Sequence, residues 1–306
     1  MDGENSKMTS FLLILGRRIF SMILMFLRHP IIIYKTNKRG KIKHQTGKKT
    51  YSRPYEIPEY KEDMKYCTSK EKYLRPVRLC ESTAPEIIAM ANKLGAFKVS
   101  DREYAENVFH FVKNNIRSRN APVFGALKTL KKGYGSCFDS SSLFITLCRC
   151  GGVKARYKIY LHKEPPEGFQ TLSDVCNEEL LGGLAIVAAF YTVAEVKLDG
   201  KWLECEVSSN PELDAYWNVP IAHFGENCGK VGGWIPDDVV YLERLPYRIT
   251  IPTNIMFKLL KGTLEEINNV TDKEWLEGKK KLEEIGREEY DRRARRRYGF
   301  LPSLED

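Results

Sequence analysis

A glycine-rich turn that runs straight into an apolar helix, residues 133–150, constrains the fold of this chain more than any other segment. The turn places Cys137 at the predicted start of the helix. Leu143 and Leu147 follow at i,i+4 spacing, which predicts one continuous buried face. Two glycines then end the helix, and residues 153–161 have the pattern of a strand. The segment predicts a core helix that leads directly into a sheet.

Cys137 is a candidate nucleophile because of its position. The unpaired N–H groups at a helix N-terminus and the positive end of the helix dipole both favour the thiolate form. A single cysteine is otherwise most often a small buried side chain. The local pattern leaves both interpretations open.

The same segment carries a family resemblance. It contains Gly-x-Gly-x-Cys-x-Asp, followed by Leu-Phe-x-x-Leu-Cys-Arg-x-x-Gly-Val-x-Ala-Arg-Tyr. This pattern resembles the nucleophile helix of the transglutaminase-like superfamily. Residues 194–206 are similar to the strand–turn–strand hairpin of that family, and residues 73–81 resemble the lead-in of its prokaryotic members. The resemblance covers about residues 73–236 and implies an α+β, papain-like core, with helices packed on an antiparallel sheet and a Cys-His-Asp site.

Transferred residue by residue, the resemblance implies catalytic positions at Cys137, Tyr191 and Glu206. The family histidine should lie four residues before the hairpin residue Glu195, where this chain has Tyr191. The acidic residue should lie four residues after Trp202, where Glu206 stands. The chain therefore departs from the family pattern at the general base.

A tyrosine does not replace a histidine as a base at neutral pH. A phenol titrates near about 10, whereas an imidazole titrates near about 6.5. The helix dipole contributes only about 0.3–1 kcal/mol at an exposed site, which is less than one pKa unit. It does not compensate for a missing imidazolium beside Cys137.

Five histidines are available to take over that role: His29, His44, His110, His162 and His223. The first two lie in the N-terminal segment, the third lies in a predicted helix, and the fourth ends a predicted strand. His223 follows the hairpin and is the best placed of the five. A lone loop histidine is more often solvated or bonded to the backbone, so both interpretations of His223 stay open.

Other chemistry is disfavoured by the cysteine pattern. The 306 residues include eight cysteines without a Cys-x-x-Cys pair, so we expect neither a structural metal nor a cofactor. Scattered unpaired cysteines in a chain of this size indicate a reducing compartment, and we expect a cytoplasmic protein.

The net charge of +9 is concentrated near the N-terminus. Twelve Lys and Arg, and no acidic residue, lie between Ser6 and Tyr55. From Glu56 onward, 37 basic and 38 acidic residues give a net charge of −1. The basicity belongs to the N-terminal segment and not to the predicted domain.

Residues 11–34 are strongly apolar, but on a helix Ser10, Arg17, Ser21 and Arg28 share one narrow stripe. This pattern favours a helix lying in the plane of a membrane surface, with basic residues beyond it attracting anionic lipids by about 1 kcal/mol per cation. A helix docked on the domain, a signal or spanning segment, and nucleic-acid binding are the alternatives. Nucleic acid is disfavoured because it leaves the apolar helix without a role.

Short motifs predict further elements. Capping boxes at Thr83, Ser100 and Thr271 predict three helix starts, and Asp199-Gly200 predicts a tight hairpin turn.

We expect three regions: residues 1–55, an amphipathic and polybasic membrane-surface arm; residues 56–250, the transglutaminase-like domain; and residues 251–306, a charged helical extension. One functional hypothesis is a thiol acyl-transfer enzyme that uses Cys137, with amide hydrolysis favoured over cross-linking. The competing hypothesis is a catalytically impaired domain that binds a peptide or protein in its cleft at the membrane surface. A redox-sensitive thiol is a third interpretation, and enzymatic activity is left open.

Overall fold

The computed structural model describes residues 52–161, 190–227 and 238–299, together with residues 16, 20, 23–24, 27–31, 33–35 and 37–38 near the N-terminus. The histidines at positions 44 and 162 lie outside the described residues.

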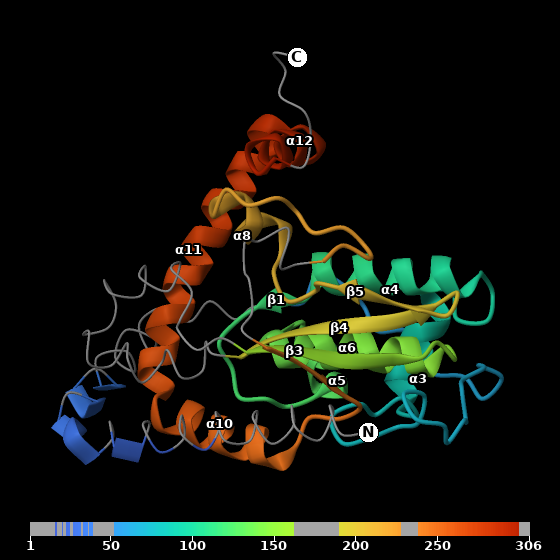
Figure 1. Ribbon diagram of the computed structural model, residues 1–306, viewed down its shortest axis with the longest axis horizontal. Helices are drawn as coiled ribbons and strands as arrows, with labels where there is room; N and C mark the ends of the chain where they lie inside the picture. Colours follow the sequence, from blue (N-terminus) through green and yellow to red (C-terminus); the bar gives the residue numbers. More distant parts are fainter. Residues whose placement is uncertain are drawn as a thin grey trace.

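In the described part of the core, helices and an antiparallel sheet pack around one buried central helix, α6 (Cys137–Cys150) (Figure 1). The helices are α3 (Pro85–Lys93), α4 (Asp101–Asn115), α5 (Ala126–Lys132), α6 (Cys137–Cys150), α8 (Pro211–Tyr216), α10 (Tyr247–Leu259), α11 (Lys261–Ile285) and α12 (Arg287–Arg297). The strands are β1 (Arg117–Ser118), β2 (Tyr134–Gly135), β3 (Ala155–Leu161), β4 (Phe190–Leu198), β5 (Lys201–Cys205) and β6 (Asp238–Leu242).

The main sheet has the order β5-β4-β3-β6, and every neighbouring pair is antiparallel. Tyr157 on β3 pairs with Ala194 on β4, and both side chains are fully buried. Side chains alternate between the two faces of a strand, so the residues in phase with this pair line the face that packs on α6. Helices α3, α4 and α5 pack on the other side of α6. The structure confirms the predicted α+β class.

Helix α6 is buried all round, from Phe138 to Cys150. Two of its buried hydroxyls bond to the helix itself: Ser142 Oγ donates to the carbonyl of Phe138 at 2.6 Å, and Thr146 Oγ1 donates to that of Ser142 at 2.6 Å. Such internal bonds remove the cost of leaving a buried hydroxyl without a partner. The prediction of a core helix is confirmed.

The end of α6 is tied to the sheet by Arg149. This fully buried guanidinium donates to the carbonyl of Ala155, at 3.1 Å from Nε and 2.9 Å from Nη2, and to that of Glu243 at 2.8 Å. One arginine of the sequence motif thus joins α6, β3 and the segment after β6. A charged group in a core needs such a set of partners.

Two predictions that depend only on neighbouring residues, one helix cap and one hairpin turn, are confirmed. Ser100 caps α4 by accepting from Glu103 N at 3.3 Å, as its capping box predicts. Asp199 and Gly200 both have positive φ, 50° and 77°, which is the geometry of the predicted hairpin turn.

Two capping predictions are wrong. Helix α3 starts after Ala84, with Pro85 in its first turn and no side-chain cap, so Thr83 does not cap it. Thr271 lies inside α11, where its hydroxyl donates to the carbonyl of Ile267 at 3.1 Å. Helix α11 continues past Thr271 because it packs on α8. The two helices are so close that a Cβ on Gly278 would lie 1.7 Å from the backbone oxygen of Glu212. This tertiary contact supports one continuous helix.

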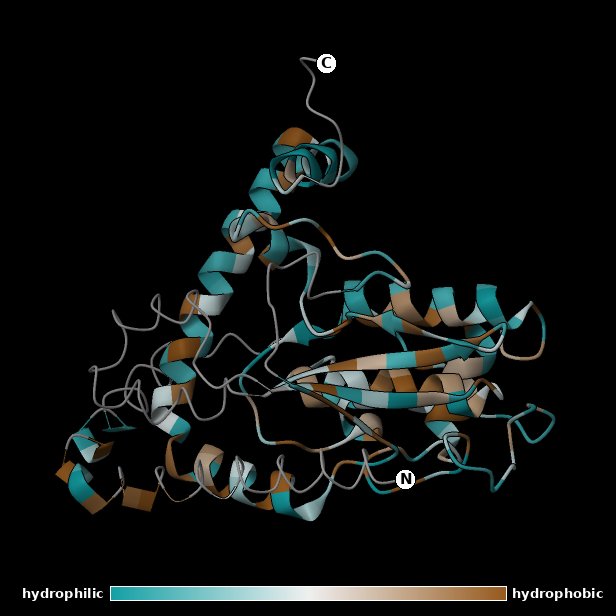
Figure 2. Ribbon diagram, in the orientation of Figure 1, coloured by the Kyte–Doolittle hydropathy of each residue, from teal (hydrophilic) through white to brown (hydrophobic). Residues whose placement is uncertain are grey.

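The last helices are rich in hydrophilic residues (Figure 2), yet they are anchored to the domain. Tyr290 Oη donates to the carbonyls of Asp214 at 2.9 Å and Val219 at 2.8 Å. Arg295 of the predicted charged extension bonds Glu226 at 2.7 Å and Asp291 at 2.7 Å. The described residues contain no helix long and apolar enough to cross a membrane.

Candidate active site

The nucleophile position is built by the turn before α6. Asp139 is fully buried and accepts hydrogen bonds from Ser136 N at 3.1 Å, Ser136 Oγ at 2.8 Å, Phe124 N at 2.9 Å and Gly125 N at 3.1 Å. A Cβ on Gly135 would lie 2.5 Å from the Asp139 side chain, so only glycine allows this approach. Burial raises the pKa of Asp139 to about 6, against the effect of these bonds. The carboxylate fixes the start of α6 and thereby the position of Cys137.

The environment of Cys137 disfavours its thiolate. Burial raises the pKa of this thiol to about 11, although hydrogen bonds from the backbone N–H groups of Thr192 and Phe138 act in the opposite direction. The nearby carboxylates of Asp139 and Glu206 raise it further. At neutral pH the sulfur is therefore held as a thiol, the poorly nucleophilic form.

Tyr191, at the position of the family histidine, is bonded to the acidic residue of the predicted site. Its Oη donates to Glu206 Oε1 at 2.7 Å. Ser208 Oγ lies 2.7 Å from the same phenol oxygen and 2.5 Å from Glu206 Oε1. The structure thus brings Tyr191 and Glu206 together in the pairing that the family pattern assigns to histidine and acid. Thr192, the next residue on β4, bonds the Cys137 sulfur.

Glu206 carries a second and stronger partner on its other oxygen. Lys113 Nζ, from α4, lies 2.9 Å from Glu206 Oε2, 3.4 Å from Asp214 Oδ2 and 3.1 Å from the carbonyl of Ser209. Burial opposes ionisation of Glu206, but the charge of Lys113 and the bonds from Lys113, Ser208 and Tyr191 outweigh it and lower its pKa. The pKa of Lys113 is raised, because Asp214 and Glu206 outweigh its burial. Burial raises the pKa of Asp214 to about 6.

Sequence reasoning missed Lys113. The available signal was its place on the helix: it follows Phe109 by four residues and Val112 by one, both fully buried. A lysine on an apolar helix face indicates a buried partner, since an unpaired buried ammonium is costly. The partner itself lies 93 residues away in the sequence.

His110 and His223 both pair with carboxylates. His223, the candidate replacement base, is 58% exposed, and its Nε2 lies 2.9 Å from Asp291 Oδ2 on α12. His110 lies 3.8 Å from Glu106 on the exposed face of α4. In the described part of the chain, neither imidazole has a contact with the Cys137 thiol.

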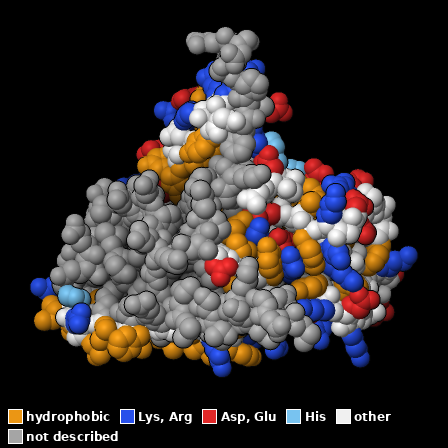
Figure 3. Space-filling model, viewed as in Figure 1, with side chains coloured by type: hydrophobic (Ala, Val, Ile, Leu, Met, Phe, Trp, Pro, Cys, Tyr) orange, Lys and Arg blue, Asp and Glu red, His pale blue; other side chains and the backbone are white. Residues whose placement is uncertain are grey.

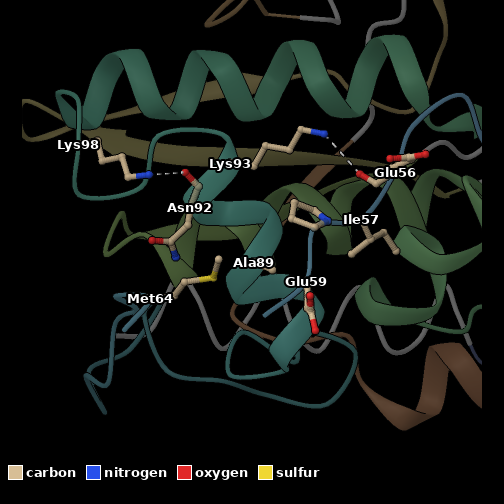
Figure 4. Close-up of a pocket in the computed structure, with 9 residues that line it drawn as sticks. Glu56, Ile57, Glu59, Met64, Ala89, Asn92, Lys93 and Lys98 are labelled. Atoms are coloured by element: carbon tan, nitrogen blue, oxygen red, sulfur yellow. Dashed lines mark hydrogen bonds between the residues drawn. The ribbon is translucent and has the colours of Figure 1, made fainter. Parts of the chain in front are cut away.

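No group of His, Cys, Asp and Glu residues that is able to hold a metal occurs among the described residues. A hollow of about 520 Å³ lies elsewhere, between α3 and the segment before it (Figure 4). It is lined by Glu56, Ile57, Pro58, Glu59, Met64, Ala89, Asn92, Lys93 and Lys98. None of the three predicted site residues lines it, and its lysines bond to backbone carbonyls, with Lys93 Nζ 3.4 Å from the oxygen of Glu56. This hollow is separate from the Cys137 site.

Comparison with known proteins agrees with the fold. Residues 88–207 match the family model of the transglutaminase-like superfamily, and this range includes Cys137, Tyr191 and Glu206. The chain therefore contains a transglutaminase-like, papain-like α+β core.

A crystal structure from Cytophaga hutchinsonii, of a candidate cysteine protease, is similar over 44% of this chain and 40% of that one, with 19% identity and a TM-score of 0.31. The chain thus spans less than half the length of that protein, and a likeness this distant carries no functional argument. No curated protein matches the chain.

Proposed function

We propose that the transglutaminase-like domain is a non-catalytic binding domain that works at a membrane surface. The observations that support this proposal most are the partner of Tyr191 and the raised pKa of the Cys137 thiol. Tyr191 occupies the histidine position and donates to Glu206, while the pKa of the Cys137 thiol is raised to about 11.

The raised pKa of Cys137 limits acyl transfer because it lowers the fraction of thiolate at neutral pH. At pH 7, a thiol with a pKa of about 11 is ionised in roughly one molecule in ten thousand. A Cys-His enzyme instead holds its thiolate beside an imidazolium that later protonates the leaving group. Tyr191 supplies neither the positive charge nor a proton acceptor, because a phenol titrates near about 10.

The ligand in this proposal is a peptide or protein segment bound beside Cys137, where the family fold holds its substrates. The site is preorganised for binding, since Glu206 is fixed by Lys113, Tyr191 and Ser208. Fixed polar groups give specificity at low entropic cost. The membrane location rests on the N-terminal arm, whose described residues include the exposed apolar side chains of Phe20, Leu27 and Ile31.

The test is the pH dependence of Cys137 alkylation by iodoacetamide, followed on the peptide that contains Cys137, with Cys137→Ser as the blank. We expect the wild-type protein to react only at pH values well above about 8.5, the value of an unperturbed thiol, because burial raises the pKa of Cys137 to about 11. Tyr191→His restores the histidine of the family pattern and is expected to lower that transition, because an imidazolium in a Cys-His arrangement stabilises the thiolate.

Tyr191→Phe is the matched control, because it removes the phenol oxygen without adding an imidazole. It is expected to leave the transition high. A wild-type transition below about pH 7 would show that a cation already activates the thiol, and would establish the thiol-enzyme hypothesis in place of this one.

A further inference from the structure

Helix α10 presents a stripe of large apolar side chains to solvent. Tyr247, Ile251, Ile255 and Leu259 are 62%, 51%, 52% and 50% exposed. Their spacing of four residues places them along one face of the helix. Single exposed apolar residues are ordinary on protein surfaces, but a contiguous row indicates an interaction surface.

The opposite face of α10 is firmly docked, so the stripe is held in a defined direction. Ile249, Met256 and Phe257 are buried. Asn254 makes two hydrogen bonds with the backbone of Val123, accepting from its N–H at 2.7 Å and donating to its carbonyl at 3.1 Å. These contacts fix the rotation of the helix about its axis.

The charge along the α10 segment has one sign. Between Glu243 and Glu265 the sequence has no acidic residue and has four basic ones, at positions 244, 248, 258 and 261. All four side chains are exposed. A basic rim around an apolar row is complementary to an anionic lipid surface, in which the apolar groups enter the interface and the cations meet the headgroups.

The stripe is continuous with the N-terminal arm. Asn37 Nδ2 donates to the carbonyl of Leu259 at 2.9 Å, and Asn37 Oδ1 accepts from Gly262 N. The arm therefore meets the junction of α10 and α11. Its described residues carry a further row of exposed apolar side chains, at Phe20, Ile23, Leu27, Ile31 and Tyr34. Helix α10 and the described parts of the arm lie along the lower edge of the molecule in Figures 1 and 2, and Figure 3 shows hydrophobic side chains at that edge.

We propose that α10 and the N-terminal arm form one membrane-binding face, and that α10 inserts its apolar stripe into the surface of an anionic bilayer. This inference rests on the proposed membrane location of the arm and adds a second contact. Two contacts on one rigid edge fix the orientation of the domain on the membrane, which one helical arm does not.

A second copy of the chain is a less favourable binding partner for the same face. A two-fold contact through α10 brings the same basic rim of both copies together, and like charges oppose that contact. Anionic lipid headgroups neutralise the rim.

The experiment is co-sedimentation of the full chain with phosphatidylcholine vesicles, with and without phosphatidylserine. The variant Ile251→Gln/Ile255→Gln removes the centre of the stripe and keeps good helix formers. We expect about a tenfold or greater loss of partitioning to vesicles containing phosphatidylserine, since two half-exposed isoleucines no longer enter the interface.

Leu276→Gln is the matched control. Leu276 is 52% exposed on α11, away from the stripe, and its replacement is expected to leave partitioning unchanged. Thermal unfolding confirms that each variant is folded.

Two further measurements separate this inference from its premise. Leu27→Gln/Ile31→Gln weakens the arm; if it abolishes partitioning while the α10 variant binds like wild type, the arm binds membranes and the role of α10 is refuted. If wild type itself fails to bind either vesicle, the membrane location is refuted together with this inference. If the wild type is a dimer by light scattering and the α10 variant is a monomer that binds vesicles normally, the stripe is a self-interface and the proposal is overturned.

Discussion

Replacing Lys113 by Met tests whether the buried ion pair holds the candidate site together. Lys113 Nζ is the cation between Glu206 at 2.9 Å and Asp214 at 3.4 Å, and all three side chains are buried. Methionine keeps a long flexible side chain in the same space but removes the charge and the hydrogen bonds. The substitution therefore leaves two carboxylates in the interior without their partner.

The expected loss of stability comes from the two buried carboxylates that remain after the substitution. Removing one partner of a buried ion pair destabilises a protein by about 3–5 kcal/mol, because the remaining charge is desolvated and unpaired. Here Asp214, whose pKa is already raised to about 6 by burial, takes up a proton more readily than an ordinary carboxyl group. We therefore expect a loss near the lower end, about 3 kcal/mol at neutral pH.

The pH dependence has a definite sign. In the wild type, the pKa of Glu206 is lowered, so its contribution to stability is present at neutral pH and is lost as the pH falls through the folded-state pKa. Without Lys113, burial dominates and raises that pKa above its unfolded value. The variant then carries its full penalty at neutral pH and loses the penalty as protonation neutralises Glu206, so the difference between the proteins shrinks towards acid.

Urea unfolding of both proteins at neutral pH and at about pH 5 measures these quantities. Lys154→Met is the control, since it removes a lysine from a solvent-exposed pair with Glu71 and is expected to change stability little. A Lys113→Met loss no larger than that of the control, or a loss that grows towards acid, refutes the account of the site as a buried charge network.

Two further substitutions test the packing and capping of the core helices. Gly151→Ala is expected to lower the free energy of unfolding by about 1–3 kcal/mol, because a Cβ there would lie 2.2 Å from Tyr104 Cε1; an unchanged urea midpoint would show that the Tyr104 ring yields without cost. Ser100→Ala is expected to cost about 1 kcal/mol in the same assay, because Ser100 Oγ accepts from Glu103 N at the start of α4. A loss below the error of the midpoint would show that solvent replaces this cap.

The parts of the fold that sequence reasoning predicted are those with local causes. The apolar periodicity of residues 137–150, the glycines that end the helix and the Asp199-Gly200 turn act over a few residues, and the structure confirms all three. The strand after the helix begins at Ala155 and not at Val153, which is an error of boundary only.

The wrong prediction at Thr271 has a non-local cause. The capping box at Thr271 satisfies the local rule, but α11 packs along α8 and the helix continues through it. Packing energy from distant segments outweighs a single cap, since most helical stability in proteins comes from tertiary contacts.

The sequence by itself determined which chemical groups the candidate site contains. The motif around Cys137 and the tyrosine at the histidine position follow from residue order alone, and they already place the missing base in the hairpin strand. Only the tertiary structure decided how those groups are charged. The partner of Glu206 is a lysine 93 residues away, and α10 shows its apolar stripe because Asn254 holds the helix to Val123. The ionisation of a buried group and the exposure of a side chain depend on which distant residues pack against it. The packing of the whole chain determines these neighbours.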